Sequence, residues 1–273
     1  MKREPRNGSE RSFMELAGKC AVVTGASRGI GKAIALRLAA AGMDVLVCAR
    51  SEHQSDPNLH GTIVETAEQI RRLGGRGVAH RADLADTADV RSVIDRARLE
   101  FGRVDVLVNN AVHIGFGSIL EAPADELDTA LAVNLRAPYL AAKLVLPLMI
   151  SQGGGAIINI TAPGARPAPV EPAPENAPPS PFRFPIHPGY GISKIALEAF
   201  TNRLAHETAP HAIGVIAVEP QFVDTEMARW LLRPDFDASG MHSPDLIARV
   251  VAEIARNPMA HSGEVVSAQD FAA

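Results

Sequence analysis

Short apolar runs alternate with longer amphipathic stretches from one end of this chain to the other. The short runs lie at 19–24, 44–49, 77–80, 104–108, 156–160, 213–218 and 264–267. The longer stretches repeat apolar residues at three- and four-residue spacing, at 30–41, 62–73, 90–101, 127–150 and 192–208. Strand followed by helix, repeated, is typical of a parallel sheet that helices cover on both faces. We therefore predict a single Rossmann-type α/β fold with a doubly wound, parallel, seven-stranded sheet.

At 273 residues, the chain has the length of one such unit. We expect a flexible, charged N-terminal segment at 1–15 and one domain at 16–273. A segment at 163–188 interrupts this domain and holds ten of the twenty prolines. Because proline lacks an amide donor and fixes φ, this insertion is predicted to be neither helix nor strand. Two interpretations stay open: a disordered surface insertion, or a lid or wall that packs over a functional site.

Charge and composition exclude several classes of protein. The net charge is −4, so the chain has no basic excess for binding nucleic acid or an anionic membrane. We find no secretory signal and no apolar run of the ~18 residues that a membrane-spanning helix needs. The two cysteines, Cys20 and Cys48, lie in predicted strands, which suits free buried thiols and a cytoplasmic location. The nine histidines show no metal-ligand spacing, so we predict no metal.

A glycine-rich turn joins the first predicted strand to the first predicted helix. Glycines let the backbone turn sharply and let a phosphate approach without a Cβ atom in the way. The helix that follows offers unpaired amides and a partial positive charge at its N-terminus. In this strand–turn–helix context the segment predicts a dinucleotide-binding site. The turn follows Thr24 and reads Gly25-Ala26-Ser27-Arg28-Gly29-Ile30-Gly31.

The spacing Gly-x-x-x-Gly-x-Gly, together with further motifs in matching order, resembles the short-chain dehydrogenase/reductase family. The resemblance extends from residue 16 to about residue 266 and implies a nicotinamide cofactor and hydride transfer. A basic residue at position 50, an insertion before position 61 and a strand end without serine add a partial likeness to the hydroxysteroid dehydrogenase-like branch. The further motifs are Asp83-Leu84, Asn109-Asn110-Ala111, Asn134 and Tyr190-Gly191-Ile192-Ser193-Lys194.

The end of the second predicted strand indicates which dinucleotide is used. A carboxylate there would bind the ribose 2′-hydroxyl of NAD, but the matching position is Ala49. Arg50 follows and Arg28 lies in the glycine-rich turn, so two guanidinium groups are expected to pair with a 2′-phosphate. We therefore predict NADP(H). The resemblance assigns further cofactor contacts to Asp83 and Leu84 near the adenine, Asn110 and Ala111 near the ribose, and Pro220, Val223 and Thr225 on the nicotinamide side.

Tyr190 and Lys194 stand four residues apart, which places both on one face of a predicted helix. In the family, such a tyrosine is the acid or base and such a lysine binds the cofactor ribose. We expect the ammonium and an oxidised nicotinamide to lower the pKa of the tyrosine. Tyr190 would then exchange a proton with the carbonyl oxygen while hydride moves at the carbonyl carbon. Asn134 matches the family asparagine and is expected to hold a water that links Lys194 to solvent.

The family's catalytic serine is missing from its expected place at the end of the fifth predicted strand. That position is Ala162, and the proline-rich insertion separates it from Tyr190. A serine hydroxyl there polarises the substrate carbonyl, and the loss of such a donor raises the barrier by several kcal/mol. Three interpretations stay open. Thr161 turns inward through a register shift, Ser180 or His187 from the insertion replaces the serine, or the protein binds NADP(H) with little turnover.

These features predict an NADP(H)-dependent oxidoreductase of the short-chain dehydrogenase type, acting on a ketone or secondary alcohol. Its catalytic residues are Tyr190, Lys194, Asn134 and Thr161. The alternative is an NADP(H)-binding sensor or scaffold with little or no turnover, and lyase or epimerase chemistry on the same scaffold is a third candidate. We expect a homodimer or homotetramer built through the long helices. The substrate is expected to be a small apolar molecule, because apolar side chains fall near the expected pocket: Phe182, Phe184, Phe222, Met227 and Trp230.

Overall fold

The computed structural model of the protein describes residues 14–53, 59–162 and 180–271. Its sheet contains seven parallel strands in the order β3-β2-β1-β4-β5-β6-β7, which confirms the predicted doubly wound, Rossmann-type α/β fold. The strands are β1 (Cys20–Thr24), β2 (Asp44–Ala49), β3 (Gly77–Arg81), β4 (Val106–Asn109), β5 (Gly155–Ile160), β6 (Ile213–Glu219) and β7 (Val265–Ser267).

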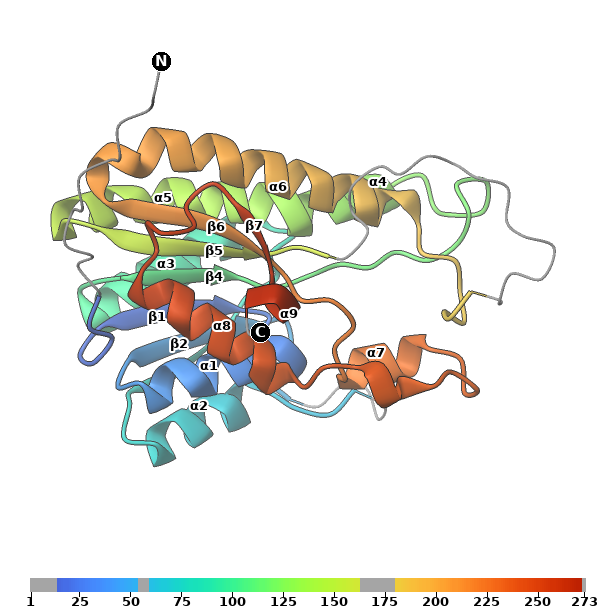
Figure 1. Ribbon diagram of the computed structural model, residues 1–273, viewed down its shortest axis with the longest axis horizontal. Helices are drawn as coiled ribbons and strands as arrows, with labels where there is room; N and C mark the ends of the chain where they lie inside the picture. Colours follow the sequence, from blue (N-terminus) through green and yellow to red (C-terminus); the bar gives the residue numbers. More distant parts are fainter. Residues whose placement is uncertain (1–13, 54–58, 163–179, 272–273) are drawn as a thin grey trace, which may run out of the picture.

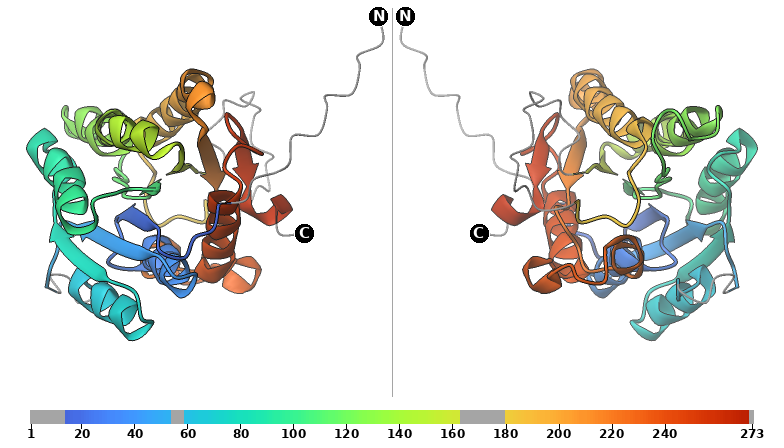
Figure 2. Two further views of the ribbon diagram at one scale, coloured as in Figure 1. Left: turned by 90° about the vertical axis from the view of Figure 1, so that its left-hand side faces the viewer. Right: turned by 90° about the vertical axis from the view of Figure 1, so that its right-hand side faces the viewer.

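Helices cover both faces of the sheet and give the molecule three layers (Figure 1). The end views in Figure 2 show α1 (Gly29–Ala40), α2 (Ile63–Arg72) and α8 (Pro244–Arg256) on one face. The other face carries α3 (Thr87–Phe101), α5 (Ala137–Gln152) and α6 (Pro188–Thr208). Three shorter helices are α4 (Glu126–Leu131), α7 (Glu226–Leu231) and α9 (Ala268–Phe271). The chain winds outward from β1 to β3 and returns past β1 to β4, so the strand order switches between β1 and β4, where α/β sheets bind ligands at the carboxyl ends of the strands.

The alternation of side chains along each strand divides the core into two layers. On one face, Ala21, Val23 and Val47 pack with residues of α1, α2 and α8. On the other face, Val22 and Leu46 pack with residues of α3 and α5. All five side chains are completely buried. Because both faces are covered, the strands read as continuous apolar runs, and this explains why their positions could be predicted.

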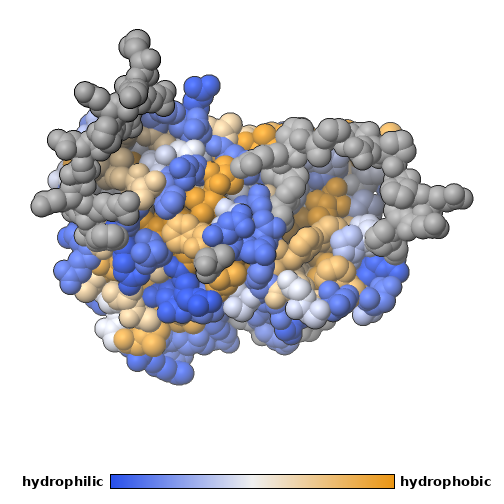
Figure 3. All heavy atoms as spheres, viewed as in Figure 1, coloured by the Kyte–Doolittle hydropathy of each residue, from blue (hydrophilic) through white to orange (hydrophobic). Residues whose placement is uncertain are grey.

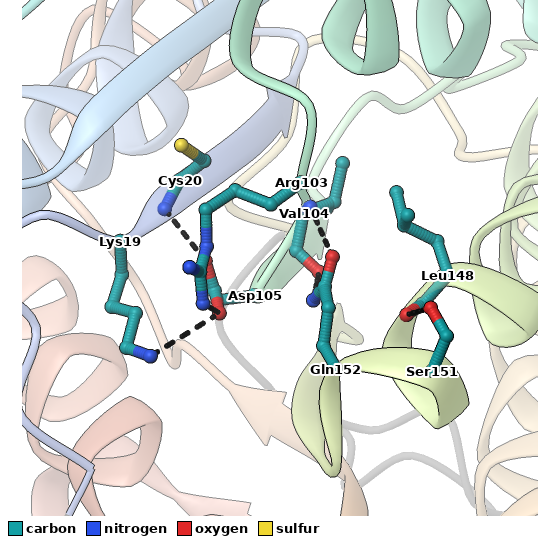
Figure 4. Close-up of polar contacts among 8 residues, drawn as sticks. All are labelled: Lys19, Cys20, Arg103, Val104, Asp105, Leu148, Ser151 and Gln152. Atoms are coloured by element: carbon teal, nitrogen blue, oxygen red, sulfur yellow. Dashed lines mark hydrogen bonds and ion pairs between the residues drawn. The ribbon is translucent and has the colours of Figure 1, made fainter.

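A buried carboxylate, Asp105, fixes the amino ends of β1 and β4, opposite the carboxyl ends of the strands (Figure 4). Asp105 accepts hydrogen bonds from Nε and Nη2 of Arg103 at 2.7 and 2.6 Å. It also accepts one from the backbone amide of Cys20 at 2.9 Å, and Lys19 Nζ lies 3.9 Å away. These contacts satisfy the buried charge and tie the two strand starts together, so that the carboxyl ends remain for a site.

One continuous helical stretch runs from Glu126 to Gln152 through α4, a π-helical turn (Ala132–Arg136) and α5. By length and composition alone, this 27-residue stretch could cross a membrane, with a mean hydropathy of 1.3 in its most apolar window. The sequence predicts a helix at 127–150, but charged residues interrupt its apolar run, so no membrane-spanning length was expected there. This stretch is the only such helix in the part of the chain that the structure describes, and it packs against α3 and α6 as part of one layer.

The described end of the proline-rich insertion, residues 180–187, packs between the loop after β4 and α7. The ring centroids of Phe116, Phe184 and Trp230 lie 5.8 to 6.1 Å apart. This part of the insertion is therefore a wall, as one of the two interpretations predicts; residues 163–179 lie outside the described residues, as does most of the predicted N-terminal segment. Backbone contacts hold the wall in place: Gly117 with Pro185, His187 with Gly115, Phe116 with Ile186, and Phe182 with Leu232.

Candidate active site

A cavity of about 830 Å³ opens at the carboxyl ends of the strands, beside the switch between β1 and β4. Figure 3 shows apolar side chains gathered at this end of the molecule, between the strand ends and α7. Ala26 and Asn134 do not line the cavity. The structure brings the other predicted site residues together around it: Gly25, Ser27, Arg28, Gly29, Ile30, Gly31, Arg50, Asp83, Leu84, Asn110, Ala111, Thr161, Tyr190, Lys194, Pro220, Val223 and Thr225.

The glycine-rich turn leaves the amino end of α1 open. Gly25 and Gly29 have φ angles of 64° and 54°, in the left-handed region that glycine favours. A Cβ atom on Gly31 would lie 2.4 Å from both Nδ2 of Asn110 and the carbonyl oxygen of Gly25, so no side chain fits there. Among the described residues, no side chain caps α1 and no acidic residue occupies its first turn. Uncapped amides at the positive end of a helix fit a phosphate group.

Two arginines flank the start of this helix. Arg28 donates from Nη2 to the carbonyl oxygen of Gly61 at 3.3 Å, while its Nε is buried without a hydrogen-bond partner in the described parts of the chain. A buried donor without a partner is unfavourable, so Arg28 fits an additional anionic ligand. Arg50 is exposed at the cavity and directly follows Ala49, where β2 ends without a carboxylate.

Hydrogen bonds from Thr24 hold the loop after β4 against the glycine-rich turn. The Thr24 hydroxyl accepts from the backbone amides of Asn110 at 2.9 Å and Ala111 at 3.0 Å. The side-chain amide of Asn110 donates in return to the carbonyl oxygens of Thr24 at 2.9 Å and Gly25 at 3.1 Å. Sequence reasoning missed this brace; a threonine that ends a buried strand just before a glycine-rich turn is the signal that points to it.

The loop after β6 has at Gln221 a backbone conformation that glycine favours. Gln221 has a φ of 59°, in the left-handed region, where a residue with a side chain is strained by about 1–3 kcal/mol. Pro220, Val223 and Thr225 from the same loop line the cavity. The Thr225 hydroxyl caps α7 by accepting from the backbone amide of Ala228 at 3.1 Å. The loop therefore has a fixed conformation beside the cavity.

Tyr190 and Lys194 both line the cavity from the start of α6. Lys194 is 2% exposed; its Nζ donates to the carbonyl oxygen of Ile160 at 2.8 Å and lies 5.9 Å from the centre of the Tyr190 ring. Burial raises the pKa of Tyr190 to about 12 and lowers the pKa of Lys194 to about 8. In the protein without cofactor the pKa of Tyr190 is thus raised, and its lowering by the ammonium together with an oxidised nicotinamide stays a prediction. The ammonium faces the ring and a backbone carbonyl, and the burial of the phenol dominates.

Ala162, at the family's serine position, lies just beyond β5 and lines the cavity. It offers a methyl group where the serine would offer a hydroxyl. Thr161 does not take over: its hydroxyl donates to Oε1 of Glu198 at 2.8 Å, inside the protein. The predicted inward turn of Thr161 is not seen, since a carboxylate 37 residues later in the chain holds the hydroxyl. Ser180 is exposed outside the cavity, whereas His187 is buried and lines it.

Asn134 is buried in the π-helical turn and makes its contacts behind the cavity. Its Nδ2 donates to the carbonyl oxygen of His113 and to Oγ of Ser193, both at 2.9 Å. Its Oδ1 accepts from the backbone amide of His113 at 2.8 Å. These bonds connect the loop after β4 to α6 next to Lys194, so the side chain helps to position α6; its water-holding role stays a prediction.

His113, which lines the cavity, contacts a polar residue that sequence reasoning missed. His113 Nε2 and Glu126 Oε1 lie 2.6 Å apart; His113 lines the cavity, whereas Glu126 is not among the lining residues. A Cβ atom on Gly115 would overlap the Glu126 carboxylate, so the small residue makes room for this contact. Glu126 opens a helix 13 residues after His113, and nothing in its local sequence indicates that it contacts this histidine.

Comparisons with known proteins agree with this geometry. The family model for short chain dehydrogenase matches residues 19–172 and 180–234. Hydroxysteroid dehydrogenase-like protein 2 of Homo sapiens is 32% identical over 251 residues, which are 92% of this chain and 56% of that protein. The chain thus spans little more than half the length of these relatives, and the predicted likeness to their branch is confirmed. Dehydrogenase/reductase SDR family member 1 of Mus musculus is 32% identical over 282 residues, covering 94% of this chain and 82% of that protein.

Solved structures share the fold. A short chain dehydrogenase from Burkholderia cenocepacia J2315 in complex with NADP has a TM-score of 0.76 and 31% identity, covering 93% of this chain and 97% of that one. A short chain dehydrogenase from Mycobacterium thermoresistibile has a TM-score of 0.79 and 27% identity, covering 94% and 86%. The matched family consists of oxidoreductases that use nicotinamide cofactors. With motifs, cavity and relatives in agreement, the chain belongs to the short-chain dehydrogenase/reductase family.

Proposed function

We propose that this protein is an NADP(H)-dependent oxidoreductase that reduces an apolar ketone or oxidises the matching secondary alcohol. One observation carries the proposal: Tyr190 and Lys194 line the same cavity as the glycine-rich turn. The helix end would bind the phosphates of a dinucleotide that transfers hydride. The phenol and the amine beside it would support the proton transfer that accompanies this step.

The cofactor would lie along the strand ends, held by groups of this chain. The amides of the glycine-rich turn would bind the pyrophosphate, and Arg28 and Arg50 would bind a 2′-phosphate on the adenosine ribose. Ala49 in place of a carboxylate favours NADP over NAD, and the NADP-bound Burkholderia cenocepacia relative supports the same choice. When bound, NADPH supplies the hydride that reduces the carbonyl carbon, and it leaves as NADP⁺.

Tyr190 acts as the acid in reduction. Because burial raises its pKa to about 12, the phenol is protonated at neutral pH and has a proton to give to the carbonyl oxygen. Lys194, with its pKa lowered to about 8, still carries most of its charge at neutral pH and stabilises the phenolate that remains. One of its N–H groups binds Ile160, and the others stay available for the cofactor ribose.

The wall opposite the cofactor favours an apolar substrate. The rings of Phe182 and Phe222 stack with their centroids 6.2 Å apart. Phe184 and Trp230, which were predicted near the pocket, pack on Phe116 and do not line the cavity. Polar residues of 180–187, the loop after β6 and α7 also line the cavity, among them His187 and Thr225, but its large apolar side chains from these segments are Phe182, Ile186, Phe222, Met227 and Leu231.

Carbonyl reduction with NADPH tests the proposal. The purified protein is mixed with NADPH and with benzil, acetophenone or cyclohexanone, and the loss of NADPH absorbance is followed. We expect turnover of at least one aromatic ketone, faster with NADPH than with NADH. Tight NADPH binding without turnover of any carbonyl would contradict the proposal and favour the sensor or scaffold that Ala162 motivates.

Arg50→Ala should lower the preference for NADPH over NADH. A charge-assisted bond to a phosphate contributes roughly 1.5–3 kcal/mol, so the ratio of kcat/KM for the two cofactors should fall about 10- to 100-fold. Arg28→Ala should cause a similar loss, because the 2′-phosphate would lose the buried Nε as a hydrogen-bond donor. Arg98→Ala on the exposed side of α3 is the control and should leave the ratio unchanged. An unchanged ratio in both test variants would contradict the NADP assignment.

A further inference from the structure

The proposed reaction needs a second hydrogen-bond donor for the substrate oxygen besides Tyr190. Such a donor stabilises the negative charge that develops on the oxygen during hydride transfer. Ala162 offers a methyl group at the family's donor position, and the Thr161 hydroxyl donates to Glu198 instead. The site is therefore incomplete unless another group near Tyr190 supplies the bond.

His187 is held rigidly beside Tyr190. It is the N-cap of α6, only 7% exposed, and it lines the cavity together with Tyr190. Its backbone amide donates to the carbonyl oxygen of Gly115 at 2.9 Å, and its own carbonyl oxygen accepts from the backbone amide of Tyr190 at 3.0 Å. His187 and Tyr190 are only three positions apart, and the hydrogen bond between the carbonyl oxygen of His187 and the amide of Tyr190 fixes the two residues relative to each other in the first turn of the helix.

The contacts of the His187 ring determine where its proton lies. Nδ1 accepts a hydrogen bond from the backbone amide of Gly189 at 3.1 Å, so it carries no proton. The neutral ring must then hold its proton on Nε2. In the described parts of the chain, no residue forms a hydrogen bond with Nε2. The ring therefore carries one N–H group with no partner among the described residues, on a residue that lines a mostly apolar cavity.

We propose that the Nε2–H group of His187 donates a hydrogen bond to the substrate carbonyl oxygen and replaces the serine that the family has at position 162. The inference rests on the proposed function and names its second oxygen-binding group. His187 keeps its proton throughout: Tyr190 transfers the proton to the oxygen, and the hydride comes from the cofactor. The histidine thus lowers the barrier without changing the balance of the reaction.

Two substitutions separate this role from helix capping. Asparagine carries an acceptor near the place of Nδ1, so His187→Asn keeps the cap and loses the donor. Glutamine carries an N–H group near the place of Nε2, so His187→Gln keeps the donor and loses the cap. With benzil or another ketone that the wild type reduces, we expect kcat of His187→Asn to fall about 100-fold, with Tm and the Kd of NADPH unchanged. We expect His187→Gln to keep more turnover than His187→Asn and to unfold at a lower Tm.

Restoring the family's hydroxyl gives a rescue test. Adding Ala162→Ser to His187→Asn should raise kcat about tenfold or more above that of the His187→Asn variant, because the serine hydroxyl then binds the same substrate oxygen. Wild-type kcat in His187→Asn would overturn the inference. So would equal losses in the Asn and Gln variants without rescue by serine, since that pattern assigns the effect to the cap.

A spectroscopic readout keeps the inference testable without turnover. The ¹⁵N-coupled NMR signals of the His187 ring are assigned by their disappearance in His187→Asn. We expect the Nε2–H tautomer, and a proton on Nδ1 would overturn the inference. If the wild type reduces ketones and Tyr190→Phe does not, while His187→Asn behaves as the wild type, only this inference fails. If the wild type reduces none, the proposed function fails.

Discussion

Tyr190→Phe should lower kcat for ketone reduction by roughly a thousandfold, while the Kd of NADPH stays within about twofold of the wild-type value. Phenylalanine keeps the ring that packs beside Lys194 but has no proton to give to the carbonyl oxygen. Because the raised pKa keeps the wild-type phenol protonated at neutral pH, the loss should be as large at pH 6 as at pH 8. Single-turnover rates and calorimetric titration with NADPH measure the two quantities separately.

The chain contains one other tyrosine, which makes a matched control. Tyr139 is 53% exposed on α5, and its ring packs on Phe200 away from the cavity. Tyr139→Phe should reduce ketones at the wild-type rate. Turnover by Tyr190→Phe above about a tenth of the wild-type rate would show that another group delivers the proton, contrary to the role given to Tyr190.

Lys194→Met should abolish turnover and yet stabilise the cofactor-free protein by about 3 kcal/mol at pH 7. Folding buries a charge at this position and lowers the pKa of Lys194 from its ordinary 10.5 to about 8. Each pKa unit corresponds to about 1.4 kcal/mol of differential stability. Methionine has a similar length and carries no charge, so it removes this penalty together with the group that stabilises the phenolate. Urea unfolding of the two proteins measures the difference.

The stabilisation should follow pH in a defined way. Below pH 8 the lysine is charged in both the folded and the unfolded chain, and the penalty for burying it is fully present. Between about pH 8 and 10.5 the folded protein releases its proton first, so the penalty fades. The difference in unfolding free energy between the variant and the wild type should therefore shrink toward zero through this window. Taking the difference removes the effects of Tyr190, Cys20 and Cys48, whose raised pKa values both proteins share.

Lys143→Met is the control for this result. Lys143 is exposed on the same layer of helices, in α5, and its replacement should change neither the unfolding free energy nor turnover. A Lys194→Met protein that is less stable than the wild type at pH 7 would contradict the prediction. It would mean that the hydrogen bond from Nζ to the carbonyl oxygen of Ile160 outweighs the burial of the charge.

The fold could be predicted where burial on both faces leaves a simple pattern. β2 ends at Ala49 as predicted, because a short continuous apolar run is typical of a strand that two layers of helices bury on both faces. The π-helical turn at Ala132–Arg136 lies inside what the sequence predicts as one helix at 127–150. The spacing of apolar residues at about 3.6 residues per turn continues through a single π-helical turn, so this spacing does not reveal the turn. α8 was not predicted, although Ile247, Val250 and Val251 give it a buried apolar face, because no motif marks that segment.

The membership of the site could be predicted, but the states of its side chains could not. Apart from Asn134, each motif ends a parallel strand or lies at the start of the loop or helix after it, and such positions share one edge of the sheet. The hydroxyl of Thr161 is held by Glu198 from a distant helix, and the pKa of Tyr190 follows from burial by several elements. Neither this hydrogen bond nor this pKa can be inferred from the spacing of residues along the sequence. The same holds for His187, whose tautomer depends on the backbone of Gly189 at the helix start.

A crystal structure of the protein with NADP⁺ is the most direct test that a phenol and an amine face the reactive ring of a bound phosphorylated dinucleotide. The complex should show the nicotinamide beside the hydroxyl of Tyr190, the ribose within reach of Lys194, and the 2′-phosphate against Arg28 and Arg50. A nicotinamide ring bound away from Tyr190 and Lys194, or a protein that binds neither NADP⁺ nor NAD⁺ in solution, would contradict it.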